Sequence, residues 1–157
     1  MTTSPDGKIA LLRHTVATLA YRGGKALRGA PAEFAGYGSR TPGEILAHIC
    51  DLVDWALTLA DGKQAWHNSQ PQAWDADIAR FFAGLEAFDR RLASGVPLAE
   101  EPERLFQGPV ADALTHVGQI AMLRRMAGCK MSGENYHVAK IETGRVGADQ
   151  AAPVKEF

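Results

Sequence analysis

The sequence has few cysteines and no long apolar run, and each absence removes a class of protein. Its two cysteines, Cys50 and Cys129, form no Cys-x-x-Cys pair and no disulfide framework, as is typical of a reducing compartment. No stretch reaches the roughly 20 apolar residues of a membrane-spanning helix. Charge and histidine interrupt residues 1–24, which therefore do not resemble a signal peptide. We expect a cytoplasmic protein without a membrane segment.

The charge is nearly balanced, with 17 basic and 18 acidic residues and a formal net charge of −1. This balance provides no basic surface for nucleic acid and no polybasic patch for a membrane. The 46% apolar and 22% charged residues are typical of a globular protein. We therefore expect a single domain over 1–157, with a core at about 8–128 and an extension at 129–157. The expected partner is a small molecule.

Apolar residues recur at helical spacing in four segments, and no segment alternates as strands do. The second segment opens with TPGE, in which Thr41, Pro42 and Glu44 form a capping box with proline at the first position. We expect an all-α protein in which the long helices pack antiparallel, with the first and last connections long enough to alter that order. The expected helices cover about 8–28, 42–61, 74–93 and 109–128, with a short one at 135–141.

Three polar side chains of the last expected helix lie along one edge beside its apolar stripe: Asp112, His116 and Gln119. A carboxylate buried there is unfavourable by several kcal/mol unless it is paired or bound to a metal. His48 of the second helix also faces inward by its spacing. Two histidines and one carboxylate form the set that holds a divalent metal with open positions.

Each of these residues also has a simpler interpretation. His48 and His116 could be ordinary hydrogen-bonded core histidines, and Gln119 could only bridge two helices. Asp112 could be a first-turn acid that the helix dipole favours. Asp51 could orient His48 from behind or could be solvated. Spacing alone leaves these alternatives open.

The segments TPGEILAHI and THVGQIAMLRRMAG resemble the DinB/YfiT-like family. The resemblance implies a four-helix bundle with long crossover loops, a homodimer, and a metal held by one side chain of the second helix and two of the last. The family pattern on the last helix is His-x3-His followed by x-Gly-Gln. His116, followed by 117–119, matches its second histidine, His48 matches the ligand of the second helix, and Asp112 departs from the pattern. The implied ligands are His48, Asp112 and His116, for Zn or Ni first, with Fe and Mn as alternatives.

The resemblance also implies a metal-dependent enzyme that activates water or a low-molecular-weight thiol for hydrolysis or S-transfer on a small molecule. Gln119 would orient a ligand without contacting the metal, and no catalytic side chain is assigned. One alternative is a non-catalytic, dimeric metal- or ligand-binding bundle that acts as a sensor or stress-response protein. Another is that Asp112 disables the site. Residues 134–137 of the extension either cover the mouth of the site or pack on the exterior.

Overall fold

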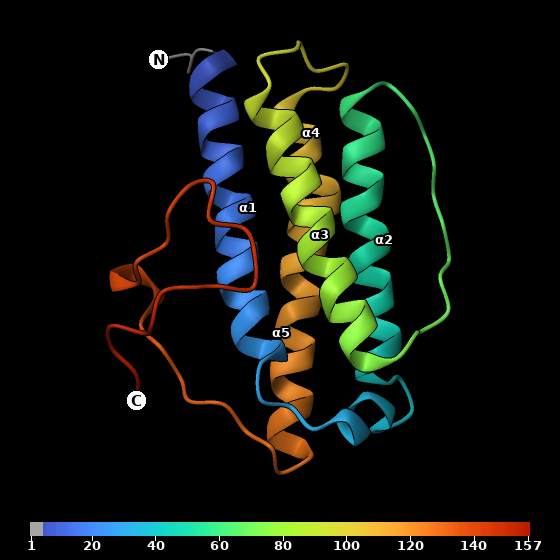
Figure 1. Cartoon of the computed structure of the whole chain (residues 1–157), viewed down its shortest axis with the longest axis vertical. Helices are drawn as coiled ribbons and strands as arrows, with labels where there is room; N and C mark the ends of the chain where they lie inside the picture. Colours follow the sequence, from blue (N-terminus) through green and yellow to red (C-terminus); the bar gives the residue numbers. More distant parts are fainter. Residues whose placement is uncertain (1–4) are drawn as a thin grey trace.

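The computed structural model describes residues 5–157, and the first four residues of the predicted domain lie outside that range. Within it the chain is all-α, as predicted, and its one extended pairing is an isolated bridge between Glu134 and Glu156 (Figure 1). No described helix combines the length and the apolar character that crossing a bilayer requires. The long helices are α1 (Pro5–Leu27), α2 (Pro42–Ala60), α3 (Trp74–Ala93) and α5 (Ala111–Met126).

The long helices do not alternate in direction along the chain. Helix α2 packs against α3 and α5, and α1 packs against the same two helices. Figure 1 shows α2 and α3 running the same way, joined by residues 61–73, which return along the length of the helices. Thirteen extended residues reach about 43 Å, whereas the 19 residues of α2 span only about 28 Å. The departure from antiparallel order thus lies in the middle connection, and not in the first or last as the sequence suggested.

The start of α2 is fixed by local hydrogen bonds. The backbone N–H of Glu44 donates to Thr41 Oγ1 at 3.2 Å, and the backbone N–H of Thr41 donates to Glu44 Oε2 at 2.8 Å. The predicted capping box is therefore confirmed. Because these bonds set where α2 begins, they also set which residues of α2 face α5.

The last helical run begins earlier than predicted. We expected it to open at Pro109, but helix already starts at α4 (Pro102–Leu105) and continues through a π-helical turn, η2 (Phe106–Val110), into α5. Pro109 has no N–H to donate, and the wider π turn accommodates the missing bond. The turn adds Gln107 and Gly108 to the surface beside Asp112.

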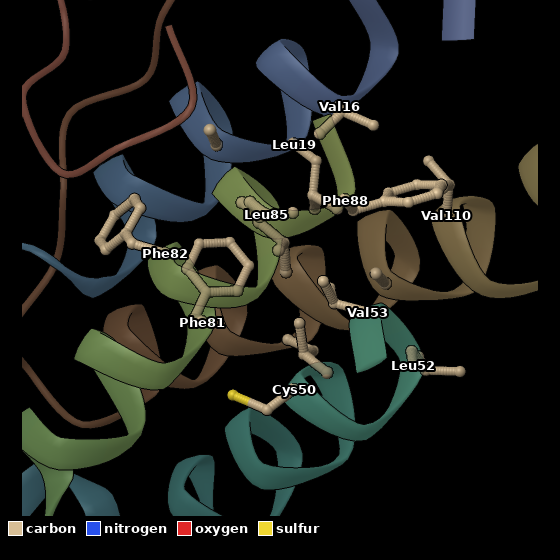
Figure 2. Close-up of a cluster of buried hydrophobic side chains, with 14 of the residues drawn as sticks. Val16, Leu19, Cys50, Leu52, Val53, Phe81, Phe82, Leu85, Phe88 and Val110 are labelled. Carbon is tan, nitrogen blue, oxygen red and sulfur yellow. The ribbon is translucent and has the colours of Figure 1, made fainter. Parts of the chain in front are cut away.

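The long helices meet in a core of aliphatic and aromatic side chains (Figure 2). Phe81 and Phe88 of α3 are its largest fully buried members. Helix α1 approaches α3 closely at Gly23, where a Cβ would lie 2.6 Å from Cζ of Phe81. A glycine is therefore required here by the packing between helices and not by a turn.

We expect Gly23→Ala to lower the free energy of unfolding by about 1–3 kcal/mol, the usual effect of overpacking a core. The intrinsic preference of alanine for a helix, about 1 kcal/mol, acts in the opposite direction. Gly118→Ala is the matched control, because Gly118 is exposed in α5 and a Cβ there meets nothing within 4 Å. That variant should gain about 0.5–1 kcal/mol. Urea unfolding measures both, and a Gly23→Ala protein as stable as the parent would contradict the close approach.

A buried arginine, Arg124, joins the C-terminal ends of α1 and α5. Arg124 donates from Nη1 to the backbone carbonyls of Ala26 and Arg28, at 2.9 and 2.8 Å, and from Nε to that of Cys129 at 2.9 Å. These carbonyls lie at or just beyond helix ends, where no partner remains within the helix. The guanidinium of Arg124 therefore supplies hydrogen-bond donors to the backbone carbonyls at two helix ends.

The extension 129–157 packs on the outside of α1. Buried Glu134 accepts hydrogen bonds from Tyr21 Oη at 2.5 Å and Lys25 Nζ at 2.8 Å. The structure therefore matches the exterior packing that the sequence left open. The helix expected over 135–141 is only a 3₁₀ turn, η3 (Tyr136–Val138). The backbone N–H of Asn135 donates to the carbonyl of Lys155 and so pairs with the chain end instead.

Candidate metal centre

His48 of α2 lies against Asp112 and His116 of α5. Nε2 of His48 is 3.6 Å from Oδ2 of Asp112, and Nε2 of His116 is 3.4 Å from Oδ1 of the same carboxylate. The two imidazole centroids are 4.7 Å apart, and the three potential ligand atoms all lie within 4.8 Å of one another. Two helices that pack together, and an i, i+4 spacing on one of them, thus bring the three predicted ligands into one cluster.

The contact between His116 and Gln119 leaves Nε2 as the ring nitrogen that can bind a metal. Nδ1 of His116 lies 2.8 Å from Oε1 of Gln119, so Nδ1 donates to that oxygen in the tautomer that carries its proton there, and Nε2 is the nitrogen on the side of Asp112. A hydrogen bond on the outer ring nitrogen is how proteins orient a histidine toward a metal. The role of Gln119 in supporting a metal ligand stays a prediction.

His48 is held in its neutral form. Burial and the neighbouring imidazole of His116 lower the pKa of His48 by more than the carboxylate of Asp112 raises it. Because its ordinary pKa is about 6.5, the lowered value leaves the ring uncharged at neutral pH. Neutral imidazole is the form that binds a metal ion.

The cluster lies at the margin of the core and not inside it. The side chains of His116, His48 and Asp112 are 13%, 28% and 47% exposed. The core-facing positions of α5 are Ala113, Val117 and Ile120, so Asp112 and His116 are each turned about 100° away from that line. The expectation that burial forces Asp112 to find a partner is therefore wrong. The short distances among the three side chains, and not the burial of a charged carboxylate, identify this site.

Two tryptophans stand beside the cluster. Trp66, in the connection 61–73, packs edge-to-face on His48 and on Trp55 of α2, with ring centroids 5.6 Å apart in both pairs. Apart from Trp66, this connection is mostly polar in sequence. A single tryptophan in a polar segment is a sequence signal that the loop packs against the rest of the protein, because an indole tends to cover apolar surface.

Asp51 has neither of the roles considered from the sequence. It is 2% exposed, so it is not solvated, and its carboxylate hydrogen-bonds away from His48. Oδ2 accepts from the backbone N–H of Ser69 at 2.8 Å, and Oδ1 accepts from Ser69 Oγ at 2.6 Å and Arg80 Nη2 at 2.7 Å. Asp51 thereby fastens the connection 61–73 to α2 and α3. Its effect on the site is indirect, because the same connection carries Trp66.

A shallow hollow of about 410 Å³ adjoins the cluster between α2 and the η2–α5 run. Asp112 belongs to both the hollow and the cluster. The hollow is therefore a route by which a small molecule can reach the three side chains. Its lining residues are Leu52, Trp55, Gln107, Gly108, Ala111, Asp112 and Thr115.

Comparisons of the chain with family models, with curated proteins and with solved structures gave no match. The resemblance to the DinB/YfiT-like family therefore stays a prediction that rests on the residues of α2 and α5.

Proposed function

We propose that this protein binds one divalent metal ion through His48, Asp112 and His116 and uses it to activate water or a low-molecular-weight thiol toward a small molecule. The observation that carries the proposal is the distance between the three potential ligand atoms, all within 4.8 Å of one another. They come from two helices, and two of them are imidazole nitrogens.

The donor set fits a first-row divalent ion. Two imidazoles suit Zn and Ni, and the combination of two histidines with one carboxylate also suits Fe(II), so Zn and Ni come first and Fe and Mn follow. Three protein ligands leave coordination positions open for a small molecule. The half-exposed carboxylate of Asp112 places those positions within reach of solvent and substrate.

The chain's own residues orient the site and leave it open on the side of Asp112. A bound divalent ion would lower the pKa of a water molecule or stabilise a thiolate. Gln119 orients the His116 ring through the contact between its Oε1 and Nδ1 of the ring. Trp66 covers one side of His48, while Asp112 stays open to the hollow. No separate general base is assigned.

We further propose that the arrangement of α1, α2, α3 and α5 is a four-helix bundle of the DinB/YfiT-like type, with residues 61–73 as its long crossover. One cluster residue on the second long helix and two on the last agree with the family pattern. The homodimer that the resemblance implies remains a prediction, and sedimentation velocity would test it, since a monomer at all concentrations would remove it.

A turnover assay separates the enzyme from the non-catalytic alternative, because a sensor could hold a metal or a ligand without converting a substrate. We expect Zn- or Ni-loaded protein to accelerate the conjugation of small thiols to electrophiles, or the hydrolysis of activated esters, and His116→Ala to lose that acceleration. The control is the parent protein stripped of metal by a chelator. Loaded protein that stays silent with several thiols and esters would instead support a sensor or binding protein.

A further inference from the structure

We infer that the substrate of this centre carries an uncharged, flat apolar group, which binds in the hollow against Trp55 while a polar group of the same molecule meets the metal. The inference rests on the proposed function, because it concerns what approaches the metal and not whether the metal binds. It assigns Trp55 a role in substrate specificity.

The position of the hollow relates it to the cluster. Leu52 and Trp55 follow His48 on one face of α2, and Ala111 and Thr115 alternate with Asp112 and His116 along α5. Asp112 lies where the hollow and the cluster meet, and it is the most exposed of the three proposed ligands. A molecule in the hollow therefore reaches the centre from the side of Asp112.

Apart from the metal itself, the lining of the hollow offers an ionic group little to pair with. Among residues 5–157, Asp112 is the only ionisable side chain that lines the hollow, and none of the described lining residues is basic. Once the Asp112 carboxylate binds a metal, no anion remains to hold an ammonium group. An uncharged group is what this lining can accept without an unpaired charge.

The walls of the hollow favour an apolar, planar shape. Trp55 is half-buried and contributes an indole to the lining, whereas Leu52 is 3% exposed and contributes little surface. Trp66 packs edge-to-face on Trp55 and on His48, so the indole wall is braced and continuous with the centre. On the opposite wall, Thr115 Oγ1 already donates to the carbonyl of Ala111, which leaves only acceptor capacity there.

Two metal-binding probes that differ only in their apolar part test this inference. Acetohydroxamate and benzohydroxamate carry the same chelating group, and calorimetry on the zinc-loaded protein gives the affinity of each. We expect benzohydroxamate to bind about tenfold more tightly, since tenfold corresponds to about 1.4 kcal/mol, the gain from covering about 55 Å² of apolar surface. Trp55→Ala should abolish the preference without changing the affinity for acetohydroxamate.

Ala111→Leu is a second variant that fills the hollow from the opposite wall, and it should reduce benzohydroxamate binding selectively even if Trp55→Ala fails to fold. Leu57→Ala is the control, because Leu57 also lies on α2 but does not line the hollow. Equal affinities of the two probes for loaded parent protein, or an unchanged preference in folded Trp55→Ala, would overturn the subsite alone. A parent protein that takes up no zinc would overturn the proposed function and this inference with it.

Discussion

Replacing His116 by alanine should weaken the binding of Zn by more than about 100-fold, because the loss of an outer partner alone typically weakens a metal site by 10–100-fold. The change removes one of the two imidazole nitrogens that face Asp112. His48 and Asp112 would remain as two ligands, 3.6 Å apart, and two ligands cannot surround an ion as three do. Competition titration against a chromogenic chelator measures the affinity over this range.

The variant Gln119→Ala distinguishes the effect of a residue that orients a metal ligand from the effect of the ligand itself. Gln119 contacts the far nitrogen of His116 and not the centre, so its removal should weaken binding by about 10–100-fold, less than His116→Ala does. The exposed His14 and His67 supply matched controls, and alanine at either should leave the affinity unchanged. If His116→Ala binds zinc as tightly as the parent, His116 is no ligand and only a histidine bonded to Gln119.

Replacing Asp51 by alanine should lower the free energy of unfolding by about 3 kcal/mol, near the lower end of values for breaking a buried ion pair. The change leaves two donors of Ser69 without an acceptor and removes one carboxylate from Arg80. Arg80 keeps its contact with Asp54, which limits the loss. Asp54→Ala is the matched control, since Asp54 shares the same arginine but is half-exposed, and it should lose less than about 1 kcal/mol. Equal losses in urea unfolding would contradict the role of Asp51.

The contribution of Asp51 should also depend on pH. Burial alone would raise the pKa of Asp51, but the hydrogen bonds from Ser69 and Arg80 outweigh burial and the net pKa is lowered. A carboxyl whose folded pKa is below its unfolded value of about 3.9 stabilises above that value, and the stabilisation disappears as the pH falls through the folded pKa. The difference in unfolding free energy between the parent and Asp51→Asn should therefore be constant from about pH 5 to 8 and shrink below about pH 4. A difference that grows toward acid would have the wrong sign.

Periodicity and capping were enough to predict most of the helical structure. The apolar stripe of α3 and the capping box of α2 are local patterns, and both helices begin where the sequence indicates. The last run was placed too late because proline usually opens a helix, whereas Pro109 lies within a π turn. The direction of α3 relative to α2 depends on how far residues 61–73 extend (Figure 1), which composition does not determine.

The spacing of the three residues predicts their cluster correctly, but the predicted burial of Asp112 is wrong. The i, i+4 spacing on α5 and the position of His48 on α2 brought the three residues together correctly. The assumption of burial failed because Asp112 lies about one residue's rotation off the core-facing line of α5. Trp66 and the bonds of Asp51 to Ser69 join α2 to the connection 61–73, and local patterns do not specify which residues such contacts join.

The departure of Asp112 from the family histidine gives the most direct test of the metal centre. Tag-free parent protein and the Asp112→His variant would each be equilibrated with zinc, freed of excess ion and assayed for metal by mass spectrometry. We expect one zinc ion per chain in both proteins, and a clear loss of zinc in Asp112→Ala. A parent protein that retains no zinc, beside an Asp112→His variant that retains one ion, would show that aspartate disables the site and would contradict the proposed metal centre.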